Sequence, residues 1–199
     1  MAGLLIVISG PSGAGKGTIY NSILERMPEI VTSISVTTRH PRKTETDGVE
    51  YFFRTEEEFS KMIANDELLE YARVFDHHYG TPKKHVMDVV ESGRTIMLEI
   101  DVKGAEQIKR KFPSCVGIFV MPPSFEVLER RLRGRATDSE ESIVKRLSEA
   151  KGELSTYKLF DYIVFNDNLH DAIDQTVSII KAERNKICRN ETKIKQLLK

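Results

Sequence analysis

Short, mostly apolar runs recur along the chain, and longer amphipathic stretches separate them. The runs at 4–9, 95–100 and 115–121 are predominantly apolar, as in strands that are buried on both faces of a sheet. We predict two further core strands, at 31–36 and 162–165. The intervening stretches predict helices at 16–26, 82–92, 103–111, 124–133, 139–157 and 169–189. This alternation predicts an α/β fold in which a parallel sheet carries helices on both faces.

The segment 36–81 departs from this alternation. Its strand candidates, at 49–53 and 68–75, carry more polar residues than the core strands. Between them, Thr55-Glu56-Glu57-Glu58 has the Thr-x-x-Glu pattern of a capping box, which predicts a short helix ending near Ala64. We therefore predict a small inserted α+β subdomain at 36–81.

Composition and charge narrow the classes of function. The chain has 199 residues, which favours one domain. Its 30 Lys and Arg balance 30 Asp and Glu, and a net charge of zero argues against nucleic acid or a membrane surface as a partner. The first apolar run is too short to span a membrane and lacks signal-peptide flanks, so we expect a cytoplasmic protein. The sequence leaves open whether the chain forms a homo-oligomer.

A glycine-rich loop stands between the first buried strand and the first helix. Its residues are Gly10, Pro11, Ser12, Gly13, Ala14, Gly15, Lys16, Gly17 and Thr18. The glycines let successive N–H groups point inward, and the following helix N-terminus adds partial positive charge. Lys16 supplies a point charge for the β- and γ-phosphates. In this strand–loop–helix context the loop is a Walker A motif, so we predict that it binds ATP rather than forming a turn without a ligand.

The loop departs from the strict Walker A pattern at one position. Gly17 stands where Ser or Thr usually follows the lysine, and Thr18 comes next. The GKGT ending occurs in nucleoside monophosphate kinases. We expect Mg²⁺ to accompany ATP, and the pattern leaves open whether Thr18 contacts the ion directly, through water or not at all.

Residues after the second strand have the chemistry to hold a phosphorylated acceptor. Arg39 and Arg42 stand three residues apart, and arginine side chains bind phosphate oxygens bidentately. Tyr51 and Tyr79 offer hydroxyl groups. Glu70 offers a carboxylate inside a largely apolar stretch. Taken alone, Glu70 fits a surface charge on an edge strand better.

Two acids, Glu99 and Asp101, end the third buried strand. This is the carboxyl edge of the sheet, where α/β proteins bind ligands. An acid here would orient Mg²⁺-bound water or the acceptor. Strand alternation puts both acids on one face, and we favour Asp101 because it lies nearer the edge. The alternative is that Asp101 caps the helix that starts near Lys103.

Motifs spread along the chain together resemble those of guanylate kinases. They are the glycine-rich loop, TTRHPR, GVEYFF, the E-Y-A…YG-T region, LEIDVKG, GRATDSEESIVKRL and FNDNL. They occur in the family's order and spacing over about residues 4–180. The resemblance implies a P-loop kinase core (about 1–35, 82–126 and 158–199), a GMP-binding insert (about 36–81) and a lid (about 127–157).

The resemblance also assigns roles to individual residues. The residues implied to bind the guanine base are Ser35, Glu70 and Thr81. Those implied to hold the GMP phosphate are Arg39, Arg42, Tyr51 and Tyr79, with Asp101 beside them. Arg135 and Arg146 match the family's lid arginines. Asn166 would lie beside the adenine of ATP, although Asn166 and Asp167 would also suit a turn and helix cap.

The activity that follows is transfer of the γ-phosphate of ATP to GMP, and to dGMP. The side chains that would stabilise the charge on the moving phosphoryl group are Lys16, Arg39, Arg135 and Arg146. No general base is needed, because the GMP phosphate is largely ionised at pH 7. One alternative is a non-catalytic guanylate-kinase-like scaffold that binds phosphopeptides; such domains lose the P-loop, which is intact here. A kinase for another monophosphate or a small metabolite is the second alternative, and Glu70 and the two tyrosines, Tyr51 and Tyr79, argue against it.

Overall fold

A five-stranded parallel sheet forms the centre of the computed structural model, which describes residues 3–74, 76–134 and 140–198. Its strands lie in the order β2-β7-β1-β8-β9. They are β1 (Leu4–Ser9), β2 (Val31–Thr32), β7 (Thr95–Glu99), β8 (Val116–Met121) and β9 (Tyr162–Phe165). All of their pairings are parallel. The predicted parallel α/β core is confirmed.

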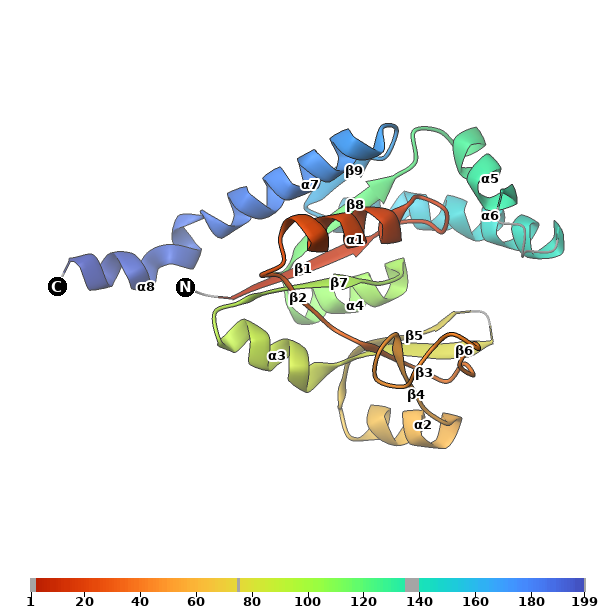
Figure 1. The fold of residues 1–199 in the computed structure, drawn as a ribbon, viewed down its shortest axis with the longest axis horizontal. Coiled ribbons are helices and arrows are strands. Elements are labelled where there is room, and N and C mark those ends of the chain that lie inside the picture. Colours follow the sequence, from red (N-terminus) through yellow and green to blue (C-terminus); the bar gives the residue numbers. More distant parts are fainter. Residues whose placement is uncertain (1–2, 75, 135–139, 199) are drawn as a thin grey trace.

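Helices cover both faces of this sheet (Figure 1). They are α1 (Lys16–Arg26) and α7 (Leu169–Arg184) on one face, and α3 (Lys83–Glu91) and α4 (Val102–Lys111) on the other. The alternation of β1 shows why both faces are buried. Ile6 and Ile8 pack into the cluster of α1 and α7, whereas Leu5 and Val7 pack into the cluster of α3 and α4.

A second, four-stranded sheet lies below the core in Figure 1, in the order β4-β3-β6-β5. Its elements are β3 (Ser35–Thr37), β4 (Tyr51–Phe53), α2 (Glu56–Ala64), β5 (Leu68–Val74) and β6 (His77–Pro82). Both hydrogen bonds of the predicted capping box form: the Thr55 side chain accepts from the Glu58 N–H, and the Glu58 side chain accepts from the Thr55 N–H. Val36, Phe59 and Leu68 form a small core of its own, separate from those of the parallel sheet.

The structure corrects two strand predictions here. The single strand expected at 31–36 is two strands, since β2 pairs with the core and β3 with the second sheet. Strand β6 was not predicted, because HHYGTP lacks an apolar run and ends in proline. It pairs along β5 from Val74 to Leu68, which places Thr81 opposite Glu70.

Two helices extend as an arm beyond the carboxyl end of β8, at the upper right of Figure 1. They are α5 (Phe125–Arg133) and α6 (Glu140–Ser155), followed by the 3₁₀ turn η1 (Thr156–Leu159). Leu128 and Leu132 of α5 pack on Ala150 of α6. The expected lid arginine Arg135 lies outside the described residues.

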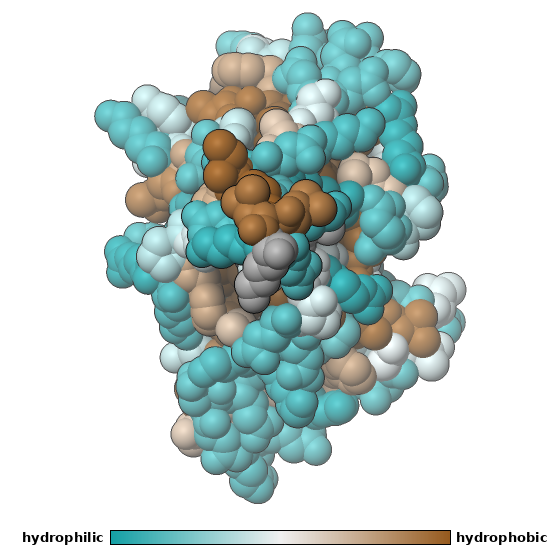
Figure 2. Space-filling model, turned by 90° about the vertical axis from the view of Figure 1, so that its left-hand side faces the viewer, coloured by the Kyte–Doolittle hydropathy of each residue, from teal (hydrophilic) through white to brown (hydrophobic). Residues whose placement is uncertain are grey.

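The predicted final helix at 169–189 is interrupted. It ends at Arg184, and α8 (Ile187–Leu197) starts after a break at Asn185 and Lys186. Helix α8 projects away from the core and leaves Ile187, Leu197 and Leu198 exposed. Figure 2 looks onto this end and shows apolar side chains within a mostly hydrophilic surface. Over the described ranges, none of the helices combines the length and apolar character needed to cross a bilayer.

Candidate active site

The glycine-rich loop connects β1 to α1 and curls around the ammonium of its lysine. Lys16 Nζ donates to the carbonyl oxygens of Gly10 at 2.7 Å and of Pro11 at 3.1 Å. Gly10 and Gly15 have φ angles of 141° and 93°, a region that L side chains rarely adopt. A Cβ at Gly10 would also lie 2.3 Å from the Val120 carbonyl oxygen. The loop therefore needs glycine at these positions to hold its shape.

Two residues from distant parts of the chain fix the loop. The amide Nδ2 of buried Asn166, just after β9, donates to the Ala14 carbonyl at 2.8 Å. Arg131 of α5 donates to the Asn166 carbonyl at 2.9 Å. The alternative that Asn166 and Asp167 cap the next helix is wrong, because Asn168 accepts from the first N–H groups of α7.

Two cavities open side by side next to this loop. One, of about 310 Å³, is bounded by the loop residues Gly10, Ser12 and Lys16 and by Arg146, Glu149 and Glu153 of α6. The other, of about 150 Å³, is bounded by residues of the second sheet, namely Ser35, Tyr51, Glu70, Val74, Tyr79 and Gly80. Both include Tyr51, Val74, Glu99, Ile100 and Asp101 in their walls, so they meet at the end of β7. A larger hollow of about 950 Å³ lies at the opposite, amino ends of the core strands, around Gly3 and Cys115.

Glu70 is buried in the smaller cavity, with 4 % of its surface exposed. Thr81 lies opposite it on β6, and its hydroxyl donates to Glu70 Oε1 at 2.7 Å. Burial, helped by the Asp101 carboxylate, raises the pKa of Glu70 to about 7, although the Thr81 hydroxyl and the Lys111 charge act to lower it. The alternative that Glu70 is a surface charge is therefore wrong, although β5 is indeed an edge strand.

The two candidate phosphate-binding arginines share a carboxylate that the sequence did not single out. Glu45 binds Arg39 bidentately, with both N–O distances at 2.9 Å, and this raises the pKa of the guanidinium. Glu45 also accepts from the backbone N–H of Arg42 at 2.8 Å, while the Arg42 side chain is 76 % exposed. The guanidinium of Arg39 lies over the Tyr51 ring, 5.4 Å from its centre. Arg39 is thus fixed beside the cavity, and Arg42 extends into solvent.

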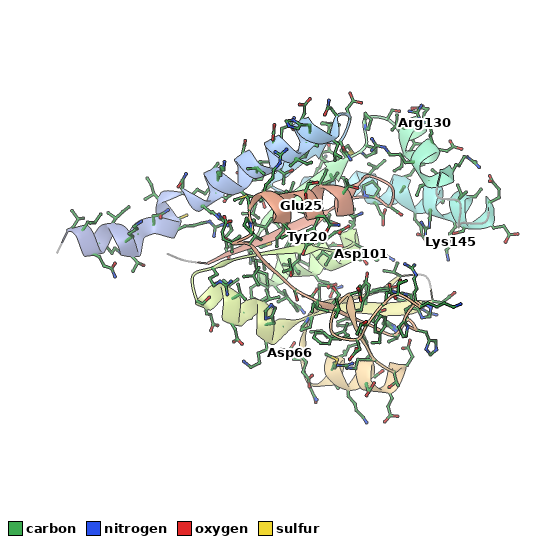
Figure 3. All side chains as sticks on the ribbon, in the orientation of Figure 1. Tyr20, Glu25, Asp66, Asp101, Arg130 and Lys145 are labelled. Atoms are coloured by element: carbon green, nitrogen blue, oxygen red, sulfur yellow. The ribbon has the colours of Figure 1, made fainter. Side chains whose placement is uncertain are left out.

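The acids at the end of β7 have separate surroundings. Asp101 caps α4 by accepting from the Gly104 N–H at 2.8 Å, and it also lines both cavities. The alternative that Asp101 caps the helix is therefore confirmed, and its role as a site residue stays a prediction; Figure 3 shows Asp101 between the core and the second sheet. Glu99 also lines both cavities, close to Gly17. Desolvation by the surrounding residues raises the pKa of Glu99 above its usual value, and the nearby Lys16 charge offsets part of this rise.

The structure brings most of the predicted site residues together, with some exceptions. Thr18 is exposed on the first turn of α1 and lines neither cavity. Sequence reasoning passed over Glu45, Arg131 and Glu153. Arg131 belongs to an arginine-dense string in which Arg130 is exposed on the outer side of α5 (Figure 3). Nothing in this string distinguishes Arg131, whose side chain turns toward the glycine-rich loop, from its exposed neighbour Arg130.

The raised pKa of Glu70 predicts a pH-dependent stability. The folded protein holds this proton more tightly than the unfolded chain, where the pKa is about 4.3. The stabilisation is present below that value and is lost as the pH rises through 7. We expect Glu70→Gln to gain on the order of 3 kcal/mol in free energy of unfolding relative to the wild type between pH 4 and pH 8. Denaturant titrations at both pH values measure this; an equal difference at the two would contradict the buried carboxylate.

Comparisons with known proteins agree with the geometry. The guanylate kinase family model matches residues 3–183. A guanylate kinase of Caldanaerobacter subterraneus is 50 % identical over 95 % of this chain and 92 % of its own length. A guanylate kinase of Synechocystis is 51 % identical over 91 % of this chain and 95 % of its own length. The crystal structure of guanylate kinase from Anaplasma phagocytophilum superposes with a TM-score of 0.79 at 36 % identity, covering 94 % of this chain and 89 % of that one. The chain belongs to the guanylate kinase family.

Proposed function

We propose that the chain transfers the γ-phosphate of ATP to GMP, giving ADP and GDP, and that the two adjacent cavities are its donor and acceptor sites. The observation that carries this proposal is their common wall at the end of β7. The P-loop lysine lies on one side of that wall and the buried carboxylate of Glu70 on the other. The guanylate kinase relatives support the same pair of substrates. The deoxy substrate dGMP presents the same base and phosphate.

Glu70 would select the base. Guanine offers N1–H and N2–H₂ side by side, and a carboxylate accepts from both. Adenine has an acceptor at N1, so it would meet Glu70 without a donor at that position. Thr81 keeps one carboxylate oxygen in place, and Ser35 adds a hydroxyl to the same cavity.

Arg39, with Tyr51 and Tyr79, would hold the GMP phosphate. Glu45 fixes the planar group of Arg39 from one side, and this would prepare Arg39 to bind a phosphate. Tyr51 and Tyr79 pack edge to face, 5.9 Å apart, at the cavity wall. Arg42 would join them by turning inward from its exposed position.

The transfer step would need positioning and charge stabilisation only. An oxygen of the ionised GMP phosphate attacks the γ-phosphorus of ATP, and the bond to the β–γ bridging oxygen breaks, so that ADP leaves with the electron pair. Lys16 and Arg146 both line the cavity beside the glycine-rich loop, where they would stabilise charge on the moving group. We propose the arm of residues 127–157 as a lid and the segment 36–81 as the acceptor subdomain; Arg135 would act with Arg146.

Mg²⁺ would accompany ATP at the same place. Glu99 and Asp101 supply carboxylate oxygens in the cavity that Lys16 also lines. Carboxylate oxygens are the ligands that Mg²⁺ prefers, and the ion usually retains several waters. When bound, it would neutralise charge on the β- and γ-phosphate oxygens. Thr18 would reach it only through water, since its side chain lies outside both cavities.

The non-catalytic scaffold alternative receives no support from these features. A phosphopeptide scaffold needs the arginine clamp alone, whereas this chain also retains a P-loop that Asn166 and Arg131 hold in shape. We also infer a cytoplasmic location, where ATP and GMP are available; Cys115 and Cys188 are both unpaired thiols.

Replacing the P-loop lysine tests the donor site. We expect Lys16→Ala to lower kcat by two to three orders of magnitude, because one preorganised donor to transition-state charge contributes about 3–4 kcal/mol. Coupled detection of ADP with ATP and GMP measures the rate. Lys84→Ala, on an exposed position of α3, is the matched control and should behave as wild type. Near-normal turnover of a folded Lys16→Ala protein would rule out this donor site.

Replacing Glu70 tests the acceptor site. We expect the wild type to use GMP well and AMP hardly at all, and Glu70→Gln to reduce kcat/KM for GMP on the order of a hundredfold, because two charge-assisted hydrogen bonds are replaced by a mismatched amide. The preference for GMP over IMP, which lacks the N2 amino group, should shrink, while KM for ATP stays the same.

The matched control is Glu57→Gln on the exposed side of α2. Glu70 would have no contact with the base if the GMP-to-IMP preference were the same in Glu70→Gln as in the wild type. Equal use of GMP and AMP by the wild type would refute the proposed function itself.

A further inference from the structure

Helix α4 of the core lies along the outer edge of β5 in the second sheet. Gly104, Gln107 and Lys111 are spaced i, i+3 and i+7, so they form one stripe on the helix. Each faces one of three consecutive residues of β5, which are Glu70, Tyr71 and Leu69 in that order. This stripe is one of the contacts between the core and the strand that carries Glu70, and it is the one that reaches Glu70 itself.

Gln107 takes the place of a neighbouring strand. As the edge of its sheet, β5 would leave the outward N–H and C=O of Tyr71 unpaired. The Gln107 side-chain amide satisfies both: Nε2 donates to the Tyr71 carbonyl at 2.6 Å, and Oε1 accepts from the Tyr71 N–H at 3.2 Å. One turn further along, Lys111 Nζ donates to the Leu69 carbonyl at 3.0 Å. The backbone on both sides of the base-facing residue is thus held by α4.

Gly104 meets the carboxylate itself. A Cβ at this position would lie 2.3 Å from Glu70 Oε2 and 2.9 Å from its Cδ, closer than any real contact. Gly104 is also held in place, because its N–H donates to the Asp101 cap at 2.8 Å. The absence of a side chain at position 104 therefore sets where the Glu70 carboxylate can lie.

We propose that Gly104 and Gln107 are positioning residues for base selection. They touch no substrate, and they act by fixing the carboxylate and backbone of Glu70 relative to the core. The inference rests on the proposed role of Glu70 in binding guanine. It adds that selectivity for guanine depends on a helix outside the acceptor subdomain.

Gly104→Ala separates this role from a structural one. Its backbone is helical, so alanine favours the helix, and the group that must move is the end of a flexible side chain. We expect thermal stability to be retained and KM for ATP to be unchanged. The preference for GMP over IMP, measured as the ratio of kcat/KM values, should fall on the order of tenfold, because the displaced carboxylate no longer meets both donors.

Gly152→Ala is the matched control. Gly152 lies within α6, and a Cβ there would meet nothing within 4 Å, so the same gain in helix propensity should leave the base preference as in the wild type. Gln107→Ala is the second variant; it should raise KM for GMP and reduce the same preference without affecting KM for ATP.

The Glu70→Gln variant in the same series separates the two possible failures. If Glu70→Gln loses the preference while Gly104→Ala and Gln107→Ala both keep it, the positioning role is refuted and the proposed function stands. If Glu70→Gln keeps the preference, the role of Glu70 fails, and the positioning role fails with it.

Discussion

The buried carboxylate of Glu70 is the constraint on which the proposed acceptor site of this protein depends. In the described part of the chain, Thr81 supplies the hydrogen bonds that reach it, and burial shifts its pKa to about 7. A buried acid with unused acceptor capacity is unfavourable for stability, and enzymes tolerate such groups where a ligand completes them. Guanine would supply the missing donors. The second sheet, the cross-strand partner on β6 and the stripe on α4 are all arranged around this side chain.

The parallel sheet brings the proposed donor and acceptor sites together. The P-loop follows β1, Glu99 and Asp101 end β7, and Asn166 follows β9, so the carboxyl ends of three strands meet at one edge. A buried Ser9 hydroxyl donates to the Ile100 carbonyl at 3.0 Å and joins the ends of β1 and β7. Because the wall at the end of β7 borders both cavities, a phosphate on each side would face the other across it.

Local sequence was enough to predict the core and the P-loop, because both depend on patterns within a few residues. Uninterrupted apolar runs mark β1 and β8, and the glycines and Lys16 mark the loop. The sequence did not predict β6, whose pairing with β5 is decided by tertiary contacts, nor the division of 31–36 between two sheets. It also did not predict that Glu45 binds Arg39, or that Gln107 completes the edge of β5. These contacts join residues far apart in the chain, and the residues next to them in the sequence do not indicate the contact. The burial of Glu70 likewise follows from the packing of β6 and α4 and not from the composition of β5.

Proton release on GMP binding tests the central claim most directly. If guanine donors complete the Glu70 carboxylate, its pKa of about 7 must fall on binding, because they stabilise the ionised form. Calorimetry in buffers of different ionisation enthalpy counts the protons. At pH 7 we expect roughly half a proton released per GMP, declining as the pH rises. The GMP phosphate, with a second pKa near 6, would contribute only about 0.1 proton at that pH. Release of no more than this phosphate share would contradict a buried, partly protonated Glu70 that binds the base.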